Sequence, residues 1–137
     1  MLDKAVIEEK MDIVERNLQF LKSFAKMEEK EFLESYKDVQ AAKFSLLECI
    51  EACIDIAGYL IVEKGLKRPE SYAEVFLILG EEGLLDESLI ERLSDMARFR
   101  NFLVHRYGEV DNKRVLEFIK ENLRDIYEFR KAVLNID

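Results

Sequence analysis

The chain has 137 residues, with 21 Lys and Arg against 29 Asp and Glu, so its formal net charge at pH 7 is −8. Hydrophobic residues make up 49% and charged residues 36%, a balance typical of a globular chain, and the length suits one domain over residues 1–137. The negative charge disfavours a protein that coats DNA or a membrane surface, and the small number of Gly and Pro disfavours a turn-rich all-β fold.

The first half of the chain predicts two long amphipathic helices. Apolar residues at helical spacing indicate one helix over residues 2–27, followed by a short charged connection at residues 28–31. A second helix is expected over residues 38–64, with Gly65 as its stop. Its apolar positions are Phe44, Leu47, Ile50, Ile54, Ala57, Leu60 and Ile61.

The second half predicts one short and two longer helices. Ser71 caps the expected short helix at residues 72–82, and Asp86 caps a helix at residues 87–104. After a break at residues 107–111, Asp111 is the N-cap candidate for a last helix at residues 112–134. Its inward residues would be Val115, Ile119, Leu123, Ile126 and Val133.

No segment has the pattern of a strand, so the sequence predicts an all-α fold. We expect an up-and-down four-helix bundle with one additional short helix. The apolar content of the long helices exceeds the needs of one small bundle, which favours a homodimer that buries one helix face.

The remaining signals concern location and cofactors. No apolar run is long enough to span a membrane, and the N-terminal residues are charged from position 3, so we expect a cytoplasmic protein without a membrane partner. Cys49 and Cys53 lie four apart in a helical pattern, which is typical of two small buried side chains. With one histidine and no Gly-rich phosphate loop, we expect neither a metal nor a cofactor.

Residues 96–111, MARFRNFLVHRYGEVD, differ from the rest of the chain. They hold the single histidine of the sequence together with arginines, an asparagine and a tyrosine. Residues 92–114 contain six basic and three acidic residues, a net charge of +3, whereas the remainder carries 15 basic and 26 acidic residues, or −11. An acidic chain therefore contains one local positive region, and the histidine lies within it.

Helical spacing indicates which of these groups can cooperate. Asn101 and His105 are four residues apart and share a face with Arg98. Arg100 and His105 are five apart, about 140° around an ideal helix at ~100° per residue. Those two side chains converge only if the helix ends or distorts near Val104, or if a second chain supplies one of them.

Such a group is suited to phosphodiester transfer on RNA, which carries its own 2′-hydroxyl nucleophile. A histidine can move a proton at neutral pH, and an arginine can neutralise charge that develops on a phosphate. The plain structural alternative stays open at this point. A lone histidine near a helix end commonly caps the helix, and helical arginines commonly form solvated ion pairs.

The run Arg100-Asn-Phe-Leu-Val-His105-Arg-Tyr107 resembles the Arg-x4-His-x-Tyr motif of HEPN proteins, specifically the HepT-type toxins that are paired with minimal nucleotidyltransferase (MNT) antitoxins. The resemblance extends over essentially the whole chain. Further runs that are similar to the family are Phe32–Tyr36, Glu51–Ala57 and Gly108–Asp111.

The resemblance implies a HEPN-like helix bundle that forms a homodimer. The motifs of both subunits would then meet in a cleft and form a metal-independent endoribonuclease site. By carry-over, Arg100 would bind the scissile phosphate, His105 would be the general acid and base, and Asn101 would be the polar residue beside the arginine. Tyr107 would accept AMP from an MNT-type nucleotidyltransferase antitoxin, and the added bulk and negative charge would repel RNA.

Further residues are candidates for supporting roles. Arg98 and Arg106 add positive charge, and Asp55, or with less weight Glu51, could pair with Arg100 from the second long helix. A second function stays open beside the ribonuclease: a non-catalytic nucleotide-binding or AMP-acceptor subunit of a nucleotidyltransferase complex, whose motif serves only the transferase.

Overall fold

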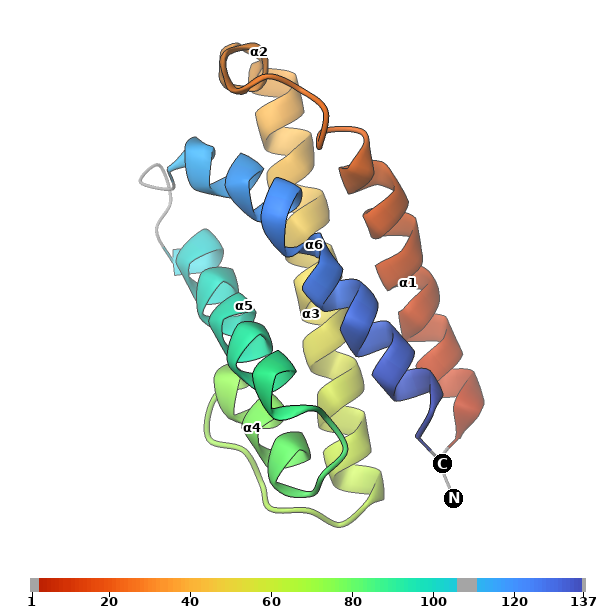
Figure 1. Ribbon diagram of the computed structural model, residues 1–137. Coiled ribbons are helices and arrows are strands. Elements are labelled where there is room, and N and C mark those ends of the chain that lie inside the picture. The colour runs from red at the N-terminus through yellow and green to blue at the C-terminus, as the bar shows by residue number, and fades with distance from the viewer. Residues whose placement is uncertain (1–2, 106–110, 137) are drawn as a thin grey trace.

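The computed structural model describes residues 3–105 and 111–136, with the backbone alone for His105, and every regular element in those ranges is a helix. Four long helices form a bundle, and two short ones complete it (Figure 1). The all-α prediction is confirmed. In chain order the helices are α1 (Lys4–Lys22), α2 (Glu29–Glu34), α3 (Tyr36–Glu63), α4 (Tyr72–Glu81), α5 (Glu87–His105) and α6 (Asn112–Leu134).

The link between the first two long helices differs from the prediction. α1 ends at Lys22 and not at residue 27, and the segment expected to be a plain connection from residue 28 contributes to the short helix α2. After α1 the chain continues in tight turns, in which the N–H of Phe24 bonds the carbonyl of Leu21 at 3.0 Å. Phe24 nevertheless stays buried against Phe32. The apolar spacing therefore continues past the end of the helix, and periodicity alone places the boundary too late.

The 28-residue helix α3 is the centre of the bundle and contacts each of the other five helices. Ser35 begins it, because its side chain accepts a hydrogen bond from the N–H of Asp38. Most of the predicted inward positions are buried. The prediction is wrong for Phe44, whose ring is 67% exposed, and Leu47 is only half-buried. Both side chains therefore lie toward the solvent-facing side of α3.

Helices α4 and α5 are antiparallel and lie unusually close together. Gly80 near the end of α4 faces Ile90 near the start of α5, and a Cβ atom at Gly80 would lie 1.8 Å from Cδ1 of that isoleucine. Glycine is therefore required for this approach. Because the end of α4 meets the start of α5, the start of α4 is brought to the end of α5, where the Arg-x4-His motif lies.

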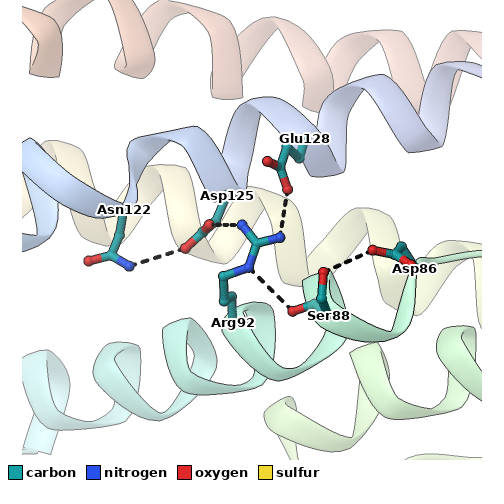
Figure 2. A network of polar contacts seen from close by, with 6 residues as sticks. All are labelled: Asp86, Ser88, Arg92, Asn122, Asp125 and Glu128. Carbon is teal, nitrogen blue, oxygen red and sulfur yellow. Dashed lines mark hydrogen bonds and ion pairs between the residues drawn. The ribbon is translucent and has the colours of Figure 1, made fainter.

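A polar network fixes α5 against α6 (Figure 2). The guanidinium of Arg92 contacts the carboxylates of Asp125 and Glu128, and its Nε donates to the carbonyl of Ser88 at 3.3 Å. The hydrogen bond to Glu128, together with the contact to Asp125, raises the pKa of Arg92 against the opposing effect of burial. Asp125 is 1% exposed and also accepts a hydrogen bond from Asn122 at 3.2 Å. The network therefore satisfies a carboxylate that is otherwise enclosed by protein.

The two cysteines are free and buried in α3, as the sequence predicts. A hydrogen bond with Cys49 and burial raise the pKa of the Cys53 thiol well above its usual value. Both thiols therefore serve as small core side chains. Among the residues that the structure describes, no helix has the length and apolar character needed to cross a membrane.

Candidate active site

Arg100 lies near the end of α5 and is held by residues from three helices. Its Nη2 atom is 3.2 Å from Oε2 of Glu51 on α3, and its Nη1 donates to Oδ1 of Asn101 at 3.1 Å. Its guanidinium also lies over the ring of Tyr72, at the start of α4, with 4.5 Å between the guanidinium carbon and the ring centroid. An ion pair, a hydrogen bond and a stacking contact therefore restrict both the position and the plane of this cation.

The arginine is enclosed but not saturated with hydrogen bonds. Its side chain is 12% exposed, whereas that of Glu51 is 45% exposed. Within the described part of the chain, Nε of Arg100 is buried and has no hydrogen-bond partner. A guanidinium has five N–H groups, so the two Nη atoms can keep their Glu51 and Asn101 contacts and still donate to an oxyanion, whereas the buried Nε is out of its reach. The arrangement thus combines a preorganised cation with unused donor capacity.

Local sequence explains why these groups meet. Ser71 caps α4 by accepting from the N–H of Glu74 at 3.2 Å, so the helix begins at Tyr72. The antiparallel packing of α4 on α5 then brings the Tyr72 ring to Arg100. Helix α3 packs against both α4 and α5. Glu51 faces the same point from α3.

A groove of about 660 Å³ opens beside this cluster. It runs between α3 and the start of α4, and Asn101 of α5 lies at its edge. Tyr72 belongs both to this groove and to the arginine contact. The cation therefore lies at the border of a cavity in the size range of small-molecule binding sites.

Two of the predicted supporting residues are not gathered around Arg100. Asp55 lies one turn beyond Glu51 and lines the groove, but its Oδ2 pairs with Nζ of Lys10 at 3.2 Å. Glu51, the less favoured of the two predicted partners, forms the ion pair with the motif arginine. Arg98 pairs with Asp95 at 2.7 Å on an exposed part of α5 and lines a different hollow.

The other motif residues are at or beyond the limit of the described segment. The described part of α5 includes His105, whose side chain lies outside the described residues, so the convergence of Arg100 and His105 stays a prediction. Arg106 and Tyr107 lie outside the described residues.

Sequence reasoning missed Tyr72 as a site residue. Its only local signal is its position after a capping serine, and that signal concerns the helix start. The contact with Arg100 joins residues 28 positions apart, and it depends on how closely α4 packs on α5. Among the described residues, no group of three or more His, Cys, Asp or Glu side chains is arranged to hold a metal ion.

The all-α bundle, with its enclosed arginine on α5, agrees with the class of domain that the motif resemblance implies, a HEPN-like helix bundle. A family model described as "Ribonuclease HepT-like" matches residues 14–133. The chain belongs to the HepT-like ribonuclease family.

Individual relatives agree with this assignment. A provisionally named RNase of Archaeoglobus fulgidus is 35% identical over 99 residues, which are 72% of this chain and 74% of the relative. The mRNA nuclease HepT of Shewanella oneidensis is 33% identical over 85 residues, 62% of this chain and 64% of the relative. Each match includes well over half of both chains.

The fold has a close counterpart among solved structures. The tri-AMPylated HEPN toxin of Shewanella oneidensis, solved in complex with an MNT antitoxin, superposes with a TM-score of 0.88 at 25% sequence identity. The match covers 99% of this chain and 100% of the toxin chain. The HEPN fold expected from the motif resemblance is therefore confirmed over the whole length.

Proposed function

We propose that this protein is a toxin of the HEPN/MNT type that cleaves RNA through Arg100 and His105. The observation that carries the proposal is the enclosed guanidinium of Arg100, fixed by Glu51, Asn101 and Tyr72 beside an open groove. Family membership supports the reaction class, since the family model is described as a ribonuclease.

The proposed reaction uses the 2′-hydroxyl of RNA as the nucleophile. His105 accepts the hydroxyl proton as a new bond forms between O2′ and phosphorus, and the bond between phosphorus and O5′ breaks. A second proton donor protonates the departing O5′. Arg100 stabilises the charge on the non-bridging oxygens, and Asn101 limits the movement of the Arg100 side chain. The products would be a 2′,3′-cyclic phosphate and a 5′-hydroxyl.

A homodimer supplies the second proton donor. One chain has a single histidine, whereas two chains related by a two-fold axis bring two copies to one cleft. Pairing residues 92–114 of the two chains, each segment with a net charge of +3, would also produce a basic cleft in an otherwise acidic dimer. We expect the active species to be this dimer, acting in the cytoplasm.

The proposed control of the toxin is modification of Tyr107 by an MNT-type nucleotidyltransferase. The structural relative from Shewanella oneidensis is described as AMPylated and bound to such an antitoxin, which supports the same chemistry for this chain. AMP on Tyr107 would place a negative phosphate two residues from His105, so RNA would be repelled electrostatically.

RNA cleavage by the purified dimer, with and without a chelator, tests the catalytic proposal. Arg100→Ala and His105→Ala should each lower kcat/KM at least about 100-fold, because one removes a charge-stabilising donor and the other the proton carrier. Arg124→Ala, which removes an exposed arginine of α6, is the matched control and should cleave as the parent does. Unchanged cleavage by both motif variants would refute the assignment.

Intact-mass analysis tests the regulatory proposal separately. Incubation with the cognate nucleotidyltransferase and ATP should add AMP to the parent and to His105→Ala, but not to Tyr107→Phe. If the parent accepts AMP but never cleaves RNA, the protein is a non-catalytic AMP-acceptor subunit, and the ribonuclease proposal fails.

A further inference from the structure

The groove between α3 and α4 has the composition of a site for a flat, uncharged ligand. Its walls are largely apolar and come from Ile54, Pro69 and Val75 as well as from the exposed ring of Tyr72. On the α3 side lies Gly58, where a Cβ atom would meet nothing within 4 Å. A side chain at this position would therefore project into open space, and glycine leaves room for a planar group.

Tyr72 connects this groove to the catalytic arginine. The guanidinium of Arg100 lies over the tyrosine ring at 4.5 Å, and the same residue lines the groove. A base stacked in the groove would thus be adjacent to the cation that is proposed to hold the scissile phosphate. Stacking on an aromatic side chain is a common way for proteins to bind unpaired RNA bases.

The ionised side chains of the groove would repel an RNA phosphate group. Both ionised residues that line it are acids, Asp55 and Glu70, and both are exposed. Lys10 compensates one of these charges by contacting Oδ2 of Asp55 at 3.2 Å. Ionised carboxylates only accept hydrogen bonds, so they favour a ligand edge that donates. The exocyclic amino groups of cytosine and adenine donate, whereas the matching O4 of uracil accepts.

We propose that this groove is a base subsite of the ribonuclease, in which the RNA base flanking the scissile phosphate lies against Tyr72 and donates its amino group to Asp55 or Glu70. The subsite rests on the ribonuclease function proposed above. It makes cleavage selective for an amino-bearing base at one side of the cut, a preference that Arg100 alone does not provide, because an arginine contacts every phosphate equally.

Gly58→Leu is the variant that tests the subsite. It fills the groove from α3 and leaves Arg100, Glu51 and Tyr72 in place. Gln40→Leu puts the same side chain on an exposed position of α3, 18 residues away, and is the matched control. We expect Gly58→Leu to lower kcat/KM for RNA at least about tenfold and to remove the preference for cytosine over uracil at the cut site, with Gln40→Leu unchanged.

Binding is measured separately from cleavage, by amide chemical shifts of the dimer. CMP should shift the signals of Gly58, Tyr72 and Asn101 at several-fold lower concentration than UMP, and Gly58→Leu should abolish the shifts. Inorganic phosphate should leave these signals unmoved. If phosphate alone reproduces the CMP shifts, or if CMP and UMP bind equally, the base subsite is refuted.

The two proposals fail in distinguishable ways. If the parent cleaves RNA and Gly58→Leu does so equally well, the subsite is refuted and the ribonuclease stands. If the parent never cleaves RNA but CMP produces the expected selective shifts, the ribonuclease fails while the groove remains a base-binding site. If Gly58→Leu instead dissociates the dimer and the parent shows no CMP shifts, a second copy of the chain covers the groove and the subsite is refuted.

Discussion

Replacing Arg92 with alanine tests whether the network in Figure 2 stabilises the fold by satisfying a buried charge. Asp125 is 1% exposed, and without the arginine it keeps only the 3.2 Å hydrogen bond from Asn122 among the contacts of that network. Removing one partner of a buried ion pair costs about 3–5 kcal/mol. The Arg92 side chain is 30% exposed, so water can enter part of the space that it leaves. We therefore expect Arg92→Ala to lower the free energy of unfolding by about 2–3 kcal/mol.

The comparison variant is Arg130→Ala, which breaks the contact of Arg130 with Glu15 between α6 and α1. Those side chains are 37% and 43% exposed, so the expected loss is at most about 1 kcal/mol. Urea unfolding at one fixed protein concentration gives both values. Asp125→Asn should remove most of the penalty, so that Arg92→Ala costs about 1 kcal/mol or less in that background. Equal losses for Arg92→Ala and Arg130→Ala would contradict the buried-charge argument.

Three further predictions follow from other contacts. Gly58→Ala should raise the free energy of unfolding by about 0.5–1 kcal/mol over the parent, because alanine favours a helix more than glycine does. Gly80→Ala should unfold with a free energy about 1–3 kcal/mol below that of Gly58→Ala, because its methyl group meets Ile90 of α5. Equal urea midpoints for the two variants would contradict the close approach of α4 and α5. Because the pKa of Cys53 is raised, its thiolate fraction at neutral pH is small, and native protein should react with iodoacetamide at least about tenfold more slowly than free cysteine; equal rates would argue against it. Glu51→Gln should lower kcat about tenfold without raising KM, since it loosens the orientation of the motif arginine and removes a competing negative charge; a higher KM at constant kcat would show that Glu51 acts in binding instead.

The sequence predicted the helical segments well because each depends on local signals. The caps at Ser71 and Asp111 both accept hydrogen bonds from backbone N–H groups in the structure, as their positions predicted. The predicted inward residues of α6 are all buried, since one side of that helix faces the core throughout. The end of α1 was misplaced because the buried ring of Phe24 continues the apolar pattern in turns that are no longer helical.

The candidate site, like the fold, was predictable only where signals local in sequence define it. The positions of Arg100 and Asn101 near the end of one helix follow from sequence spacing, as does the concentration of positive charge around them. The partners of Arg100 do not follow. Glu51 and Asp55 share a face of α3, and spacing cannot choose between them. The structure pairs Asp55 with Lys10 on α1, and the longer side chain of Glu51 reaches the arginine.

By itself, therefore, the sequence determined an all-α chain with a basic motif at a helix end, because helix formation and motif spacing depend on neighbours within a few turns. Only the tertiary structure decided that Tyr72 supports the guanidinium of Arg100 and that a groove opens next to it. The contact with Tyr72 requires α4 to approach α5 closely, which the absence of a side chain at Gly80 permits, and the groove requires the start of α4 to lie beside α3. Distances between helices depend on side chains that lie far apart in sequence, and no local pattern records them.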